Sequence, residues 1–205
     1  MAIDVVHDTQ EVFRTILHCM SRPGTIKSIG KGGEQEEHRG FCSHSILLSA
    51  VTLLDAEVRF HVIGENAASI EALFSAHTLS KVTDLHKADY IFIMQDDQQQ
   101  FLQDVFTKAK KGTLVDPQKS ATVIIETESL ANEHNLVLEG PGIANKENVE
   151  ISGSAYWMDA RAEAIKEYPL GVDMILIDRQ SNLMCLPRTT IIHDRGGVLN
   201  GLCSS

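Results

Sequence analysis

The chain has 205 residues, of which 43% are hydrophobic and 22% charged, and its 18 lysines and arginines against 28 carboxylates give a formal net charge of −10. This composition is ordinary for a soluble globular protein, and the acidic balance argues against nucleic acid or an anionic membrane as a partner. Because there is no apolar stretch of about 18 residues and no charged-then-apolar leader, we expect no membrane span, no secretory signal and a cytoplasmic location.

Helices and strands are predicted to alternate along the first half of the chain. Asp8 and Glu11 have the spacing of a capping box ahead of an apolar helical stripe, and Pro23 with Gly24 ends that helix. Ser43 precedes a run that is apolar nearly all round, which is typical of a buried helix. The predicted elements are helices over residues 9–20, 46–54 and 66–74, strands over 25–29, 58–63 and 88–94, and a polar loop over 30–40.

The second half is predicted to end in a β-hairpin over residues 168–190. Two apolar runs, 172–177 and 183–186, flank a polar turn, and Pro187 stops the second run. Before the hairpin the sequence predicts a helix around 101–106 closed by Gly112, strands over 121–126 and 136–138, and a helix from Ser154 to Pro169. One face of that last helix carries Trp157, Arg161, Ala164, Ile165 and Tyr168. The tail over 194–205 is expected to fray.

Together these elements predict one domain over residues 1–205. Alternating helices and strands that finish in a hairpin favour a three-layer α/β/α fold with a mixed sheet. Helix 46–54 and the outer side of the hairpin carry more apolar surface than one domain normally leaves bare. We therefore expect a homodimer built on that surface.

The hairpin carries polar residues that strand packing does not explain. Asp173 is an acid in an apolar strand, and Arg188-Thr189-Thr190 places a guanidinium and two hydroxyls at a strand end, where α/β proteins bind ligands and partners. Arg188 has an alternative role in an internal salt bridge with Asp173 or Glu139. These two interpretations predict different effects of removing Arg188, on binding or on stability.

Two further stretches are candidates for binding. Gly140-Pro141-Gly142 follows a predicted strand and is either a tight turn or a nest of N–H groups that binds an anion. Arg14 lies off the apolar stripe of its helix and is either a solvated charge or a contact residue.

No pattern for a metal, a cofactor or a catalytic group is present. The four cysteines are far apart and form no Cys-x-x-Cys pair, which argues against zinc, a disulfide framework and an iron-sulfur cluster. There is no phosphate-binding glycine motif, zinc-protease motif or nucleophile elbow. Schiff-base chemistry with pyridoxal phosphate needs a lysine at an apolar strand end, where its pKa is lowered. No lysine has that setting, and Lys119, just before the strand predicted from Ala121, comes nearest to it. We expect no cofactor, no metal and no catalytic residue in this chain.

Six segments, in this order and spacing, resemble the PhnH family of the bacterial carbon-phosphorus lyase system. They run from Phe13 to Thr190, whereas the loop over 30–40 and the tail after Ile192 carry no match. The segments are Phe13-Arg14-x-x-Leu17-x-x-Met20-Ser21-x-Pro23-Gly24, Leu53-Leu54-Asp55-x-Glu57-Val58, Ala121-Thr122-Val123, Leu138-x-Gly140-Pro141-Gly142-Ile143, Tyr168-Pro169-x-Gly171-Val172-Asp173 and Pro187-Arg188-Thr189-Thr190.

The resemblance implies a subunit of an assembly. PhnH proteins act with PhnG, PhnI and PhnJ in a core complex, in which PhnI and its accessory subunits attach a phosphonate to the ribose of ATP and displace adenine. It also implies a homodimer whose fold is similar to pyridoxal-phosphate-dependent transferases without the cofactor. The candidates it supports for binding a partner or a ligand are Arg14, Ser21, Gly140, Pro141, Gly142, Asp173, Arg188, Thr189 and Thr190.

The alternative is a stand-alone enzyme or sensor for phosphate or phosphonate esters. Arginine suits that task, because its planar fork binds two phosphate oxygens at once. Against it, no spacing recommends a nucleophile and base pair or a carboxylate cluster.

Overall fold

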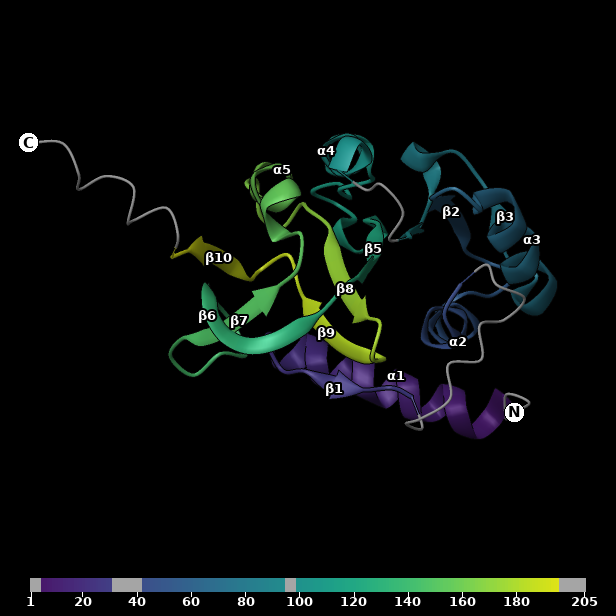
Figure 1. Ribbon diagram of the computed structural model, residues 1–205. Coiled ribbons are helices and arrows are strands. Elements are labelled where there is room, and N and C mark those ends of the chain that lie inside the picture. The colour runs from purple at the N-terminus through teal and green to yellow at the C-terminus, as the bar shows by residue number, and fades with distance from the viewer. Residues whose placement is uncertain (1–4, 31–41, 95–98, 196–205) are drawn as a thin grey trace, which may run out of the picture.

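The computed structural model describes residues 5–30, 42–94 and 99–195, which form two β-sheets and five α-helices (Figure 1). The helices are α1 (Val5–Ser21), α2 (His44–Leu53), α3 (Ala67–Thr78), α4 (Gln99–Lys108) and α5 (Met158–Ala164). The strands are β1 (Lys27–Ser28), β2 (Arg59–Ile63), β3 (Lys81–Val82), β4 (Tyr90–Ile93), β5 (Thr122–Thr127), β6 (Leu130–Glu139), β7 (Glu147–Ile151), β8 (Asp173–Asp178), β9 (Asn182–Leu186) and β10 (Ile191–Asp194).

The larger sheet is mixed, as the sequence predicted. Its seven strands have the order β1-β9-β8-β5-β4-β2-β3. The pairs from β8 to β3 are parallel, whereas β9 is antiparallel to both β8 and β1. The smaller sheet, with the order β10-β6-β7, is antiparallel throughout.

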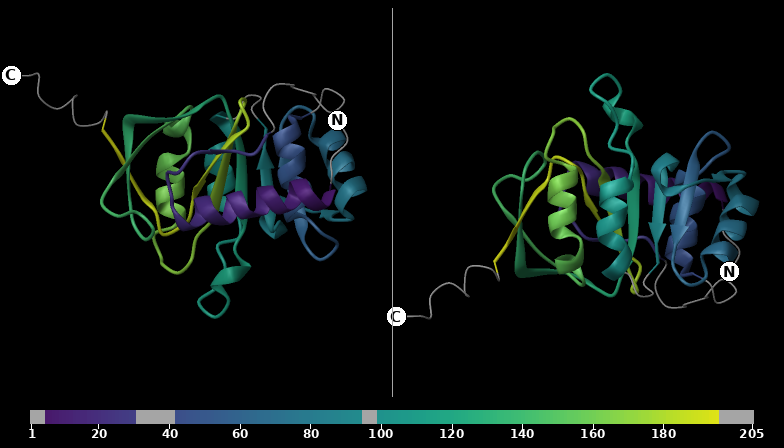
Figure 2. Two further views of the ribbon diagram at one scale, coloured as in Figure 1. Left: turned by 90° about the horizontal axis from the view of Figure 1, so that it is seen from below. Right: turned by 90° about the horizontal axis from the view of Figure 1, so that it is seen from above.

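Helices cover both faces of the larger sheet. Successive residues of a strand point to opposite faces, so in β4 Phe92 packs with α1, α2 and α3 while Ile91 and Ile93 pack with α4 and α5. Figure 2 shows α1 on the face seen from below and α4 with α5 on the face seen from above. Because both faces are covered, β4, β5 and β8 can be apolar almost without interruption.

The predicted hairpin is confirmed as β8 and β9, with Met174 opposite Leu186 and Ile177 opposite Leu183. The buried Asp178 organises its turn. One carboxylate oxygen of Asp178 accepts hydrogen bonds from the backbone N–H groups of Gln180 (2.9 Å) and Asn182 (2.8 Å), and the other accepts from the N–H of Leu130 (3.2 Å). One acid therefore shapes the turn and ties the hairpin to β6.

The apolar surface predicted for dimer formation is not bare, so that location is wrong. Ile46, Leu47 and Ala50 are fully buried within this chain, and β8 and β9 are buried on both faces. The exposed apolar side chains lie elsewhere, on the outer side of α1, around β3, on the segment between α4 and β5, on either side of α5 and at the start of β10.

The smaller sheet was largely missed by the sequence patterns. Its central strand was predicted only over 136–138, yet β6 runs over ten residues, with a shift in register between Ala131 and Leu136. Strands β7 and β10 were not predicted at all, and Asp194, assigned to a frayed tail, is the last residue of β10. Residues 196–205 of that tail lie outside the described residues, as do residues 31–40 of the predicted polar loop.

Helix boundaries also moved. Helix α1 already begins at Val5, so Asp8 lies inside the helix and the predicted capping box is wrong. Phe13 is exposed, whereas Val12, Ile16 and Cys19 form the buried side of the helix. By contrast, Ser43 caps α2 as expected, its hydroxyl accepting from the N–H of Ile46 at 3.4 Å.

Candidate functional site

The structure brings most of the sequence candidates together at one end of the larger sheet. An added Cβ at Gly142 would lie 2.3 Å from the backbone oxygen of Ser21, and one at Gly140 would lie 2.7 Å from that of Thr189. Both glycines have positive φ, so close backbone approach explains why glycine stands at each position. The N–H of Ile143 bonds to the oxygen of Gly140 at 3.2 Å, which makes this segment a turn.

Arg188 forms the internal salt bridge that was the alternative to a binding role. Its guanidinium pairs with the Asp173 carboxylate, and its own backbone N–H donates to the same carboxylate at 2.8 Å. The remaining donors bond to the hydroxyl of Ser120 and to the carbonyl oxygens of Pro117 (2.9 Å) and Pro169 (3.3 Å). Arg188 therefore fastens the end of β9 to the segment that precedes β5.

Glu139, the other proposed partner of Arg188, is engaged elsewhere. Its carboxylate lies 2.7 Å from the ammonium of Lys146, and this hydrogen bond and charge lower the pKa of Glu139. Asp173 is thus the carboxylate that balances Arg188.

A second arginine, Arg161, was not among the candidates, and it binds the backbone of the loop over residues 187–190 that contains Arg188. Arg161 of α5 is only 1% exposed, and its guanidinium donates to the backbone oxygens of Thr190 (3.1 Å) and Pro187 (2.8 Å). Burial lowers the pKa of Arg161 to about 10, against the opposing effect of the negative charge of Asp173, so the side chain stays charged at neutral pH. Its Nε has no hydrogen-bond partner among the described residues.

The sequence did hold a signal for Arg161. It lies on the same helical face as Trp157 and Ala164, both of which are buried, and an arginine at a core position needs acceptors that the fold must supply. Tyr168, assigned to that face as well, is instead 74% exposed.

Arg161 and Arg188 both line a groove between α5 and β10, which we call the α5–β10 groove. Its volume is about 570 Å³, within the usual range for ligand sites. Asp159, Arg161, Tyr168, Arg188 and Thr189 supply its polar groups. Its apolar lining consists of Pro141, Met158, Ala162, Ile165, Ile191 and Ile192. Three of the sequence candidates, Pro141, Arg188 and Thr189, therefore face one cavity.

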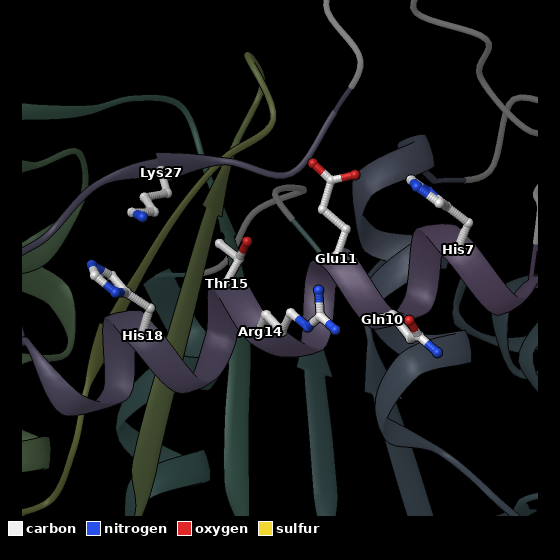
Figure 3. A pocket seen from close by; sticks show the side chains of 7 residues that line it. All are labelled: His7, Gln10, Glu11, Arg14, Thr15, His18 and Lys27. Atoms are coloured by element: carbon white, nitrogen blue, oxygen red, sulfur yellow. The ribbon is translucent and has the colours of Figure 1, made fainter.

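Arg14 lies apart from this groove, in a second cavity of about 500 Å³ along the outer side of α1. Figure 3 shows Lys27 of β1 facing the side of α1 that carries Thr15 and His18. Partial shielding from water, together with the positive charges of Lys27 and Arg22, lowers the pKa of His18. Arg14 and Lys27 line this cavity with the single carboxylate of Glu11, so its lining carries a net positive charge on an acidic protein, a setting that suits an anion.

The potential metal ligands of the described residues are dispersed. No three His, Cys, Asp or Glu side chains within residues 5–30, 42–94 and 99–195 are grouped so as to hold a metal ion. Cys19, Cys42 and Cys185 are buried free thiols, and burial raises the pKa of Cys42 to about 12. None of the described helices is long and apolar enough to cross a bilayer.

Comparison with known proteins gives consistent matches over most of the chain. The family model described as "Bacterial phosphonate metabolism protein (PhnH)" matches residues 2–193. The "Alpha-D-ribose 1-methylphosphonate 5-triphosphate synthase subunit PhnH" of Rhizobium meliloti (strain 1021) is 28% identical over 189 residues, covering 91% of this chain and 91% of the relative. The "Putative C-P lyase subunit protein HtxG" of Stutzerimonas stutzeri is 27% identical over 200 residues, covering 91% of this chain and 87% of the relative.

Proposed function

Because the chain belongs to the PhnH family of bacterial phosphonate metabolism proteins, we propose that it is an accessory subunit of the carbon-phosphorus lyase core complex. In that role it supports the formation of ribose 1-phosphonate 5-triphosphate from ATP and a phosphonate, together with PhnG, PhnI and PhnJ in the cytoplasm. The observation that carries the proposal is the family match over residues 2–193, with two relatives named as subunits of this system.

The geometry of the α5–β10 groove supports a non-catalytic role. Arg161 and Arg188, its two guanidiniums, are held by main-chain oxygens and by Asp173, so both are used to build the surface. Groups that act on a substrate normally keep donors free for it. The groove therefore resembles a docking surface more than a reaction centre.

The proposal also covers the type of fold. We place the chain with three-layer α/β/α proteins similar to pyridoxal-phosphate-dependent transferases, without the cofactor. Lys119, the lysine nearest to a cofactor position by sequence, has a side chain that is 70% exposed and lies 2.9 Å from the Asp116 carboxylate. A solvated, ion-paired ammonium is not the desolvated amine that Schiff-base chemistry uses.

Co-expression tests the assembly. With an affinity tag on PhnI, we expect this chain to co-purify with PhnG, PhnI and PhnJ in constant proportion through size-exclusion chromatography. A three-subunit complex that forms without this chain, in cells where it is abundant and folded, would overturn the proposal.

Free of its partners, the chain is proposed to form a homodimer. The exposed apolar side chains Phe13, Leu17, Leu114, Val115 and Tyr168 offer surface for it. Light scattering at micromolar concentration distinguishes a dimer from a monomer.

The cavity along α1 favours a second function, the binding of a phosphate-bearing small molecule. Arg14 and His18 of α1 and Lys27 of β1 line it. Calorimetric titration with pyrophosphate or ribose 5-phosphate tests this. Binding that is lost in Arg14→Ala would support it, and no heat for either anion would dismiss it.

A further inference from the structure

Residues 111–120, which we call the arm, project from the body of the protein between α4 and β5. Figure 2 shows this segment extending outward from the body of the protein, downward in the left view and upward in the right view. Its root is closed by an antiparallel bridge between Lys111 and Ser120. Leu114 and Val115, which stand between Gly112 and Pro117, are 76% and 88% exposed. Two adjacent large aliphatic side chains are thus presented to water.

The arm is held in one conformation by its own hydrogen bonds. The N–H of Asp116 donates to the hydroxyl of Thr113 at 2.9 Å, and the N–H groups of Thr113 and Lys119 both donate to the Asp116 carbonyl at 3.2 Å. At the root, the N–H of Gly171 bonds to the oxygen of Lys111 at 2.9 Å. A rigid segment loses little conformational entropy on docking, so an exposed apolar pair on it is suited to binding.

Arg188 connects the arm to the α5–β10 groove. Its guanidinium donates to Pro117 and Ser120 of the arm, and the same side chain lines the groove. The arm and the groove consequently lie at the same edge of the larger sheet, before β5 and after β9. The groove supplies a concave apolar lining, and the arm supplies a convex apolar tip.

The charges of the two surfaces are complementary. The arm carries Lys111 and Lys119 against the single carboxylate of Asp116, which lies 2.9 Å from the ammonium of Lys119, in a chain whose net charge is −10. Lys111 therefore leaves the arm with a net positive charge. Asp159 lines the groove, and Glu163 and Glu167, four and eight residues further along the chain and next to the lining residues Ala162 and Tyr168, are exposed as well. A basic arm with an apolar tip thus matches an apolar groove with an acidic border.

We propose that the arm of one copy inserts Leu114 and Val115 into the α5–β10 groove of a second copy of this chain, and receives the second arm in return. This inference rests on the homodimer of the proposed function and assigns its contact. A twofold dimer needs the two complementary surfaces on the same side of each protomer, and their common link through Arg188 places them there. Arg188 is a positioning residue in this contact, because it fixes the arm relative to the groove.

Substitution at the tip tests the contact in the full chain. Val115→Asp places a charge in the apolar groove, so we expect the dimer dissociation constant to rise by about 30-fold or more, the size typical of a hot-spot residue. The matched control is Leu79→Asp, since Leu79 is 74% exposed and lies at a position of positive φ that Asp tolerates. Analytical ultracentrifugation measures both, and circular dichroism confirms that both variants are folded.

Three outcomes separate this inference from the homodimer itself. A wild-type chain that is monomeric at micromolar concentration overturns both. A dimer that resists Val115→Asp as well as Leu79→Asp overturns only the arm-to-groove contact. A dimer weakened by Val115→Asp and untouched by the control supports it.

A cross-link between copies tests the pairing directly. Two proteins are prepared in a Cys203→Ser background, one with Leu114→Cys and one with Ile191→Cys, and their mixture is oxidised with copper phenanthroline. We expect a disulfide-linked dimer in the mixture and much less in either protein alone. If the mixture yields no more than the separate proteins, the arm does not enter the groove.

Discussion

The groove beside α5 and the cavity along α1 both contain arginines, yet they use them in opposite ways. In the groove, Arg161 is 1% exposed and the side chain of Arg188 is 15% exposed, and the terminal nitrogens of both guanidiniums donate to the chain's own oxygens. In the cavity, Arg14 is exposed on the outer side of its helix. An arginine can therefore serve to hold the fold together or to face solvent, and the acceptors around it distinguish the two roles.

The largest loss of stability is expected from replacing Arg161, the more buried of the two arginines in the groove. Arg161→Met leaves the backbone oxygens of Pro187 and Thr190 without their donors, and each hydrogen bond to a charged group contributes about 1.5 to 3 kcal/mol. We expect the free energy of unfolding to fall by about 3 kcal/mol, measured by urea denaturation. A loss below about 1 kcal/mol would show that the loop over 187–190 is held without Arg161.

Arg188→Ala should destabilise the chain by somewhat less, about 2 kcal/mol, because water reaches the pair and partly compensates Asp173. Of the two interpretations drawn from the sequence, this expectation follows the internal salt bridge, whereas a pure binding role would leave folding nearly intact. Asp173→Asn provides the partner for a double-mutant cycle, in which the combined loss should be clearly smaller than the sum. Additive losses would mean that the two side chains do not stabilise each other. Partner affinity of the folded fraction, measured in parallel, isolates any binding role.

Arg14→Ala should change the free energy of unfolding by less than about 0.5 kcal/mol, as is usual for an exposed side chain. Denaturation of this variant beside Arg161→Met measures the contrast between the two regions directly. If Arg14→Ala lowered the free energy of unfolding as much as Arg161→Met, burial and hydrogen bonding would not distinguish the roles of the two arginines.

The smallest expected effect is electrostatic. Shielding from water and the charges of Lys27 and Arg22 lower the pKa of His18, so its NMR titration midpoint should lie below about 6.5, the usual value for histidine. Since protonation is disfavoured in the folded state, any linked change lowers stability as pH falls through this range. Lys27→Ala should move the midpoint upward, and so should added salt. A midpoint that stays unchanged in both experiments would mean that the charge of Lys27 does not affect the pKa of His18.

Local sequence patterns were sufficient where short-range order decides the structure. The hairpin was predicted because two apolar runs flank a polar turn, and helix α2 because Ser43 precedes an apolar run. Strands β7 and β10 were not predicted, since their polar residues interrupt any apolar run and both strands pair only with β6. Pairing between distant segments is not written in any local window.

The candidate site was likewise predicted where local sequence was informative and missed where it depends on contacts between distant segments. Asp173 and Arg188 were singled out because neither suits strand packing, and their salt bridge was named as an alternative to binding. Arg161 was seen on its helix face but not selected, because its acceptors are carbonyl oxygens of a loop about 26 to 29 residues away, which no spacing rule identifies. The groove itself needed the meeting of α5 and β10 in space.

The pairing of β1 with β9 has a consequence for how this chain is made. Helix α1 and β1 leave the ribosome early, but they pack against β9, and Cys19 contacts the backbone of Leu183 across a separation of 164 residues. At 5 to 20 residues per second, the nascent chain waits roughly 8 to 33 seconds before the strand that shelters Val12, Ile16 and Cys19 is synthesised. During that interval the part of the apolar side of α1 that packs on β9 is available to chaperones. Nascent chains stalled before Asp173 should therefore be retained by them, whereas chains released after Asp194 should not.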